Sequence, residues 1–371
     1  MIVDGIGRDR FLREFWQRKP VLLRQAFPGF ADPVTPEELA GLACEREVES
    51  RLVFTRGKRW QLRNGPFRTR DFTSLPARNW TLLVQSVDQW VPAVRSLLQT
   101  VPFVPTWRVD DVMISYATPN GGVGPHFDYY DVFLVQGLGS RRWRTGQHCT
   151  AADELRTDSG LKLLKHFETV QEWELHSGDV LYVPPGIAHW GVSIDDSLCY
   201  SIGFRAPSVA DMLLGYSDEL AALQSPDLRF TDPRRTQPLR SGEITSADLQ
   251  QARKLLQQAL RDETALAHWF GKQMTQPRCA DLVQAGDARL SASSRIRLHA
   301  ASRLAWQEQG RQLLVYVDGD ATVLPGSARL RLLLQQLAGG HSIGWREVGT
   351  PSALKAWCRL LLAQGSLQVD A

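Results

Sequence analysis

The chain has 371 residues, more than one average domain, so two or three folded units are expected. Apolar residues make up 43% of it and charged residues 22%, which are ordinary globular values, and no low-complexity tract argues for disorder. The net charge is only +3, but residues 271–371 hold 12 Lys or Arg against 7 Asp or Glu. This excess is interpreted as a solvated face, and contact with RNA or an acidic surface is the alternative.

The first residues are not expected to form a targeting signal. Charges recur every few positions up to Pro20, so this stretch is interpreted as neither a signal peptide nor an anchor. No uninterrupted apolar run approaches the length of a membrane span. The five cysteines form no CxxC pair and are expected to be thiols in a reducing compartment. We therefore expect a soluble, cytoplasmic protein.

The section up to about Trp90 mixes helices with short strands. Phe11, Phe15 and Trp16 follow helical spacing, and Lys19-Pro20 should stop this helix before an extended run at 21–23. A second helix should begin at Pro36, because Pro and acidic residues suit a first turn. We expect this section to pack as a flank on a later core.

Residues 107–207 change in character. Short runs rich in Val, Ile, Leu, Tyr and Phe are separated by glycine- and proline-containing turns, for example at 118–122, 137–140 and 184–186. Many short strands at regular spacing indicate a β-barrel or sandwich. We therefore place a barrel core in this section.

Residues 208–272 predict helices again. Apolar residues recur at three- and four-residue spacing over 211–224 and 246–262, and Ser246 is the expected N-cap of the second helix. Such a helix pair outside a barrel suits self-association, and plain packing within one chain explains the pattern nearly as well.

Residues 273–371 predict a small separate α+β domain. Two β-rich runs around Asp318-Gly319 indicate a hairpin. A helix capped by Ser327 should follow, with an apolar face, and then a second helix. The apolar faces are Leu330, Leu333, Leu334 and Leu337 in the first helix and Leu354, Trp357, Leu361 and Leu362 in the second. Helices with a hairpin suit a winged-helix module, and no metal or catalytic residues are expected there.

The chemistry is predicted at His126, Asp128 and His189. His126 and Asp128 are two residues apart in a segment that reads as a strand, so both side chains point to the same face. His189 follows the strand DVLYVPP and its turn. Two histidines and one carboxylate leave three metal positions open, which is typical of iron(II) oxygenases that chelate a 2-oxo acid and then bind dioxygen.

A buried cation is needed for the distal carboxylate of 2-oxoglutarate. In the run SRRWRTG, Arg141 shares a strand face with Trp143, and a large aromatic residue prefers the interior. Arg141 is therefore the candidate for this carboxylate. Ser115 bears the only hydroxyl on its face of the preceding strand and is a second candidate donor.

Weaker signals stay open. An HxD triplet alone is a poor indicator of a metal site, and the prediction depends on the glycine-rich entry, the basic strand and the second histidine together. Tyr129, Tyr130 and Asp131 either line a substrate pocket or form a turn where the strand ends. The remaining histidines are interpreted as surface or packing residues: His148, His166, His176, His268, His299 and His341.

The motifs GGVGPHFDYYDVFLVQGLGSRRW, GDVLYVPPGIAHWG and YSIGFRAPS resemble those of the bacterial JmjC-type ribosomal oxygenases, most of all the arginine hydroxylases of large-subunit ribosomal protein sixteen. The resemblance is specific up to about residue 210. It implies a double-stranded β-helix (cupin/JmjC) barrel domain at 1–207, a helical dimerisation segment at 208–272 and a winged-helix-like domain at 273–371. It also implies that His126, Asp128 and His189 bind iron(II), and that Arg141, assisted by Ser115, binds 2-oxoglutarate.

The activity implied by the resemblance is hydroxylation of an arginyl β-carbon in a ribosomal protein by a homodimer, with dioxygen and 2-oxoglutarate as cosubstrates. Histidyl hydroxylation of another ribosomal protein, or oxidation of a small molecule, is the alternative. An acidic residue lining the pocket, such as Asp110, Asp111 or Asp131, would favour a guanidinium. A non-catalytic cupin that binds nucleic acid is a third hypothesis, supported only by the C-terminal charge. Neither membrane association nor direct DNA binding is expected.

Overall fold

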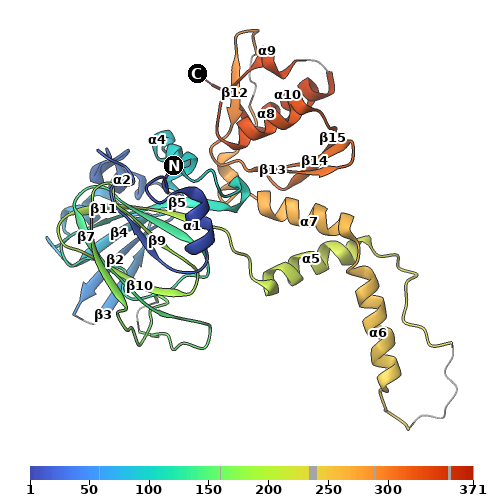
Figure 1. Ribbon diagram of the computed structural model, residues 1–371, viewed down its shortest axis with the longest axis horizontal. Helices are drawn as coiled ribbons and strands as arrows, with labels where there is room; N and C mark the ends of the chain where they lie inside the picture. Colours follow the sequence, from blue (N-terminus) through green and yellow to red (C-terminus); the bar gives the residue numbers. More distant parts are fainter. Residues whose placement is uncertain (58, 159, 234–239, 287–289, 350–351, 371) are drawn as a thin grey trace. The chain divides into compact units, whose positions relative to one another are not determined.

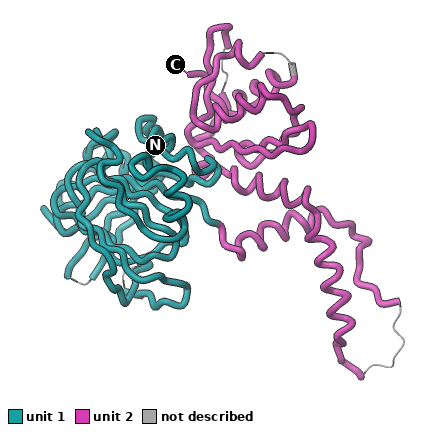
Figure 2. The backbone as a smooth tube through the Cα atoms, in the orientation of Figure 1, with its two compact units in different colours: residues 1–206 teal, residues 207–371 magenta. Residues whose placement is uncertain are grey.

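The computed structural model describes residues 1–57, 59–158, 160–233, 240–286, 290–349 and 352–370. The chain forms two compact units, Met1–Ala206 and Pro207–Ala371 (Figure 2). Among the described residues, no helix has both the length and the apolar character needed to cross a bilayer. The three-part division stays a prediction, and α7 (Glu263–Thr275) runs across its second boundary.

Two antiparallel sheets form a barrel in the first unit (Figure 1). The larger has the strand order β1-β9-β6-β11-β5-β4-β2-β3, and the smaller has the order β10-β7-β8. The strands of the larger sheet are β1 (Val21–Leu23), β2 (Ser50–Arg56), β3 (Arg59–Asn64), β4 (Trp80–Val84), β5 (Val109–Ala117), β6 (Val132–Gln136), β9 (Val180–Val183) and β11 (Ser197–Phe204). Those of the smaller sheet are β7 (Ser140–His148), β8 (Gln171–His176) and β10 (Ile187–Ser193). The predicted mainly β barrel is confirmed, and β5 to β11 lie within its expected core.

Strand β11 shows how the sequence separates the barrel interior from the outer core. All eight of its residues are buried. Its large apolar side chains join the core shared with the N-terminal section, and its small residues alternate with them on the other face. The outer residues are Leu198, Tyr200, Ile202 and Phe204, and the inner ones include Ser197, Cys199 and Ser201. The inward face of β11 is thus lined by small residues, and Cys199 joins an apolar cluster there with Leu134, Trp143 and Leu181.

The N-terminal flank covers the outer core, but its first helix is shorter than predicted. Helix α1 (Arg8–Glu14) ends five residues before Lys19. Gln17 adopts a positive φ of 55°, its backbone N–H donates to Tyr182 Oη at 2.8 Å, and its amide donates to Asp131 at 3.0 Å. These bonds to distant strands override local helical spacing. Helix α2 (Pro36–Leu42) begins where expected, with a capping box at Thr35.

Short helices complete this unit. They are α3 (Thr69–Thr73), α4 (Pro92–Arg95), η1 (Val87–Gln89), η2 (Ser96–Thr100) and η3 (Thr106–Arg108).

The second unit begins with helices, as predicted. They are α5 (Val209–Leu223), α6 (Ser246–Ala259) and α7, followed by the short η4 (Ala280–Leu282). Helices α5 and α7 pack together through Tyr216, Leu220 and Trp269. The N-cap of α6 is Thr245 rather than Ser246, because the Thr245 hydroxyl accepts from the N–H of Asp248.

The remainder of the second unit is α+β, also as predicted. Asp318 and Gly319, with φ of 51° and 89°, form the tight turn between β14 and β15, and Ser327 caps α8. The strands are β12 (Arg295–Leu298), β13 (Leu304–Gln309), β14 (Gln312–Val317), β15 (Asp320–Pro325), β16 (Ile343–Gly344) and β17 (Leu367–Asp370), and the helices are α8 (Ala328–Ala338), α9 (Trp345–Val348) and α10 (Ser352–Gln364). The predicted apolar faces of α8 and α10 form its core. Its winged-helix character stays a prediction.

Candidate active site

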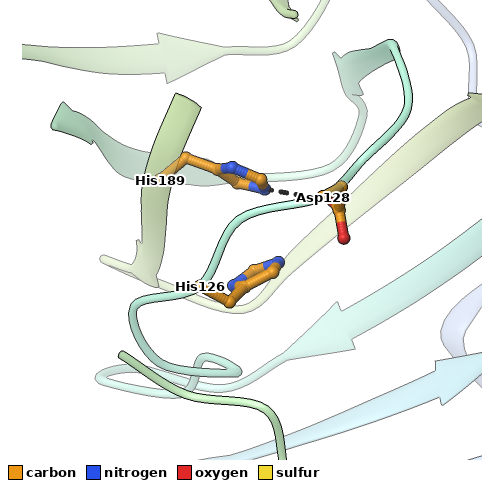
Figure 3. Close-up of side chains that lie close together, drawn as sticks. All are labelled: His126, Asp128 and His189. Atoms are coloured by element: carbon orange, nitrogen blue, oxygen red, sulfur yellow. Dashed lines mark ion pairs between the residues drawn. The ribbon is translucent and has the colours of Figure 1, made fainter. Parts of the chain in front are cut away.

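The barrel brings His126, Asp128 and His189 together (Figure 3). One potential ligand atom from each lies within 4.8 Å of the others, and His189 Nε2 is 3.6 Å from Asp128 Oδ2. His126 and His189 exchange two backbone hydrogen bonds, of 3.1 and 2.7 Å, which hold the segment before Asp128 against β10. His126 and Asp128 therefore lie in an extended segment that a single β-bridge joins to β10, and not on a regular strand as predicted.

Both imidazoles are oriented by main-chain carbonyls. Nδ1 of His126 lies 2.9 Å from the carbonyl oxygen of Gly124, and Nδ1 of His189 lies 3.0 Å from that of Ile187. Since a carbonyl oxygen only accepts, each Nδ1 carries the proton and each Nε2 keeps its lone pair. Burial, together with His126, lowers the pKa of His189 to about 4. The His189 imidazole is therefore neutral near pH 7, as a metal ligand must be.

The chemistry of these donors fits a divalent transition metal. Two imidazole nitrogens and one carboxylate occupy one side of an ion, which leaves positions on the other side for exchangeable ligands. A closed structural site would need four protein ligands. The residues present can thus hold iron(II) in an open, reactive arrangement.

Arg141 is a buried cation in the barrel interior. Its side chain donates four hydrogen bonds, from Nε and Nη2 to Ser197 Oγ and O, and from Nη1 and Nη2 to Ser115 Oγ and O, over 2.7 to 3.0 Å. The residue is 5% exposed, and no carboxylate among the described residues lies within 4.0 Å of it. Burial lowers its pKa. An enclosed, uncompensated guanidinium with a donor to spare is chemically suited to an anion, and the predicted role of Arg141 in binding 2-oxoglutarate stays a prediction.

The inward face of β7 adds polar atoms to the same interior. Trp143 and Thr145 alternate with exposed Arg142, which pairs with Glu172 outside. Trp143 Nε1 and Thr145 Oγ1 are buried and have no hydrogen-bond partner in the described part of the chain. Such orphaned groups are rare in native interiors unless a ligand or water satisfies them. The interior therefore fits a polar molecule such as 2-oxoglutarate.

Ser115 lies beside Arg141, as the strand pattern suggested, but Ser197 was missed. The Ser115 hydroxyl accepts from Arg141, so in this structure it orients the guanidinium, and its predicted bond to a carboxylate stays a prediction. Ser197 does the same from β11. Ser197 lies beside Arg141 because it pairs with Ala117 across strands β11 and β5. The local sequence around Ser197 does not indicate that pairing.

The three aspartates considered for guanidinium recognition are engaged elsewhere. Asp110 pairs with Arg205 at 3.2 Å. Asp111 accepts three hydrogen bonds from Gln85 and Ser86. These two acids therefore stabilise the chain's own structure.

Asp131 is 0% exposed and accepts from Tyr182 Oη at 2.5 Å and from the Gln17 amide. Asp131, predicted either to line a substrate pocket or to form a turn, is instead a buried residue that anchors Tyr182 and Gln17. The side chains of Tyr129 and Tyr130 are exposed. The hydroxyl end of Tyr130 is nevertheless shielded from solvent and lies near the Asp128 carboxylate, and both effects raise the pKa of Tyr130.

Comparison with known proteins places this site in a family context. The family model described as "JmjC domain" matches residues 96–212. The chain is 38% identical over 274 residues to the ribosomal protein uL16 3-hydroxylase of Escherichia coli (strain K12), which covers 72% of this chain and 71% of that protein. It is 37% identical over 82 residues to a bifunctional lysine-specific demethylase and histidyl-hydroxylase of Drosophila erecta, covering 21% and 12%.

The likeness extends to solved structures. The structure of a ribosomal oxygenase from Escherichia coli in complex with cobalt and 2-oxoglutarate superposes with a TM-score of 0.84 at 30% identity, covering 98% of both chains. A protein with the same overall fold thus binds cobalt and 2-oxoglutarate.

Replacing Tyr182 by Phe tests the buried hydrogen bonds that Tyr182 makes with Asp131 and Gln17. Because the buried Asp131 and the Gln17 N–H each lose a partner, we expect the free energy of unfolding to fall by about 1–3 kcal/mol. Chemical denaturation measures it. Tyr200→Phe is the matched control, since its partner Asp32 is partly exposed and water can replace the lost bond, so its loss should be smaller. Equal losses in the two variants would contradict the buried anchor.

Proposed function

The chain belongs to the JmjC-domain ribosomal oxygenases, and on that basis we propose that it hydroxylates the β-carbon of an arginyl residue in a large-subunit ribosomal protein, in the cytoplasm. It is a 2-oxoglutarate-dependent dioxygenase with iron(II) as its metal. The choice of arginine and of the ribosomal substrate rests on the similarity to the uL16 3-hydroxylase.

The proposed roles of the site residues follow from their geometry. His126, Asp128 and His189 hold iron(II) through two Nε2 atoms and one carboxylate oxygen. With iron and 2-oxoglutarate bound, dioxygen supplies one oxygen atom to the substrate C–H bond and one to succinate, and carbon dioxide is released. The chain's own contribution is to keep both imidazoles neutral and to fix their orientation.

The observation that carries the cosubstrate assignment is the uncompensated charge of Arg141. Its guanidinium binds the distal carboxylate of 2-oxoglutarate, and Ser115 and Ser197 hold the guanidinium in place. The orphaned groups of Trp143 and Thr145 lie in the same interior and gain partners when a polar cosubstrate is present.

Histidyl hydroxylation is the second candidate. The similarity to a histidyl-hydroxylase favours it, but that similarity spans 82 residues, against 274 for the uL16 3-hydroxylase. The exposed aromatic rings of Tyr129 and Tyr130 lie next to Asp128 and suit a guanidinium through cation–π contact. The non-catalytic cupin is disfavoured by the assembled metal residues.

We also propose that the protein acts as a homodimer through α5 and α6. Helix α6 contains no buried residue, and Leu249, Leu256 and Leu260 form an exposed stripe along it at 59, 66 and 49% exposure. Helix α5 exposes Leu213 and Leu214 as well. A helix of this length is marginal in water without tertiary packing. A second copy of the chain would cover these leucines.

Hydroxylation is tested with iron(II)-loaded protein, 2-oxoglutarate and the purified ribosomal protein, followed by mass spectrometry of its peptides. One added oxygen on an arginine is expected, and none with Asp128→Ala. An oxygen on histidine would favour the second candidate instead. Turnover of 2-oxoglutarate without any modified residue would contradict both.

Arg141→Lys tests the cosubstrate site. A lysine keeps the charge but loses the bidentate fork, so the KM for 2-oxoglutarate should rise roughly 30-fold, corresponding to about 2 kcal/mol. Arg142→Lys, on the outer face of the same strand, should leave this KM unchanged. Steady-state kinetics decide the matter, and equal KM values for the two variants would rule out the assignment.

The dimer is tested by size-exclusion chromatography with light scattering. We expect twice the monomer mass for the natural sequence and the monomer mass for the double variant Leu249→Glu/Leu256→Glu. Gln250→Glu/Gln257→Glu, on exposed polar positions of the same helix, should stay dimeric. A natural sequence that elutes as a monomer would refute the proposal.

A further inference from the structure

A short segment of the first unit carries a strong positive charge that the oxygenase chemistry does not use. Residues 51–78 hold eight Lys or Arg and a single acid, Asp71, although the whole chain has a net charge of only +3. The segment contains the β2–β3 hairpin, α3 and the loop that leads to β4. The rest of the chain is net negative, so this charge is local.

The arginines face one another across the hairpin. Arg56 of β2 and Arg59 of β3 are direct cross-strand partners, and both are exposed. Arg78 precedes Asn79, whose carbonyl accepts from the Thr55 N–H beside the same hairpin end. We call Arg56, Arg59 and Arg78 the hairpin arginines. Among the described residues, none of them has a carboxylate within 4.0 Å. Like charges directly opposite each other destabilise a sheet. Asp158 pairs with Arg156, and Arg59 is near enough to contribute to lowering the pKa of that carboxyl, so a further negatively charged partner would relieve the arginine pairing.

A cavity of about 250 Å³ adjoins this hairpin. Trp60 and Trp190 line it, with ring centroids 6.5 Å apart at 69°. Thr55, Asn79, Asn120 and Val192 complete its wall, together with two glycines. The side-chain amides of Asn79 and Asn120 make no hydrogen bond within the described part of the chain. The cavity thus joins two aromatic rings with unused donors and acceptors.

Two further arginines lie against the tryptophans. The guanidinium carbon of Arg156 is 5.2 Å from the Trp60 ring centroid, and that of Arg144 is 5.4 Å from the Trp190 ring centroid. Trp190 follows His189 on β10, where alternate side chains point to opposite faces, so its ring faces away from the barrel interior. None of the three metal residues lines the cavity.

We propose that the hairpin arginines and the Trp60–Trp190 cavity bind single-stranded RNA. Cations along a surface with a partly exposed aromatic ring beside them match the way proteins hold single strands, with phosphates on arginines and a base against the ring of Trp190. Amide groups without partners can read the edge of an unstacked base. An acidic peptide would use the charge but not the rings. The choice of RNA over DNA rests on the proposed ribosomal substrate.

A protective role for the arginines is the competing explanation. Strand β3 lies at the edge of the larger sheet, and charged residues prevent edge strands from pairing with other molecules. Charge of either sign serves that purpose. Replacing the arginines by glutamates therefore separates protection of the edge from RNA binding.

The test measures binding of a fluorescein-labelled oligouridine to the full chain by anisotropy, in the presence of a chelator so that the outcome does not depend on turnover. The affinity for the oligouridine should decrease as the salt concentration is raised from about 50 to 200 mM. Arg56→Ala/Arg59→Ala should weaken binding at least tenfold and reduce the slope of log K against log salt by about 1.4. The control variant Arg8→Ala/Arg13→Ala on α1 removes the same charge and should change neither the affinity nor the salt slope.

Two further measurements decide between the explanations. Arg56→Glu/Arg59→Glu should remain monodisperse and lose RNA binding, and ultraviolet cross-linking should label peptides that contain Trp60 or Trp190. RNA binding by the glutamate variant at natural strength would overturn the proposal. So would displacement of the RNA by polyglutamate as effectively as by unlabelled RNA, without cross-links to the tryptophans. Hydroxylation of the isolated ribosomal protein should be unchanged in the alanine variant, so this proposal and the proposed function fail separately.

Discussion

A guanidinium enclosed in a barrel must be balanced by negative charge, and this constraint shapes the interior around Arg141. The chain provides two serines with their carbonyl oxygens but no carboxylate among the described residues, so the charge is solvated by dipoles and left uncompensated. Dipoles alone compensate a buried charge only in part. The strands that supply these serines, β5 and β11, pair directly, so the sheet itself holds the guanidinium in place. The site depends on that pairing more than on any loop.

The apolar side of the same sheet explains why the inner face can carry buried polar groups. Phe11 of α1 packs against Tyr182 and Phe133 on the outer face, at ring centroid distances of 5.0 and 5.6 Å. Hydrophobic burial on this face stabilises the barrel, which frees the inner face to carry serines, Thr145 and Arg141. Asp131 and Tyr182 connect the two layers where β6 begins, three residues after Asp128.

Patterns that are local in sequence were predictable, and contacts between distant segments were not. Alternation along β7 identified Arg141 as the inward arginine because Trp143 marks that face. The metal residues were predictable from two short motifs. The role of Ser197 depends on strand pairing across most of the barrel, and the early end of α1 depends on bonds from Gln17 to Tyr182 and Asp131. The spacing of apolar residues along the chain does not indicate these distant partners, since tertiary contacts override local propensity at both positions.

The bridge between His126 and His189 has a consequence for how the protein handles its metal. The two main-chain hydrogen bonds hold the backbone segments that carry both imidazoles against each other. A zinc finger, in contrast, folds only when its metal arrives, so that binding energy becomes folding energy. Here the ligands are preorganised by a hydrophobic barrel, and the free energy of binding is available for affinity. The positions of the two imidazoles are therefore set by main-chain hydrogen bonds of the barrel, so the fold itself defines where the metal binds.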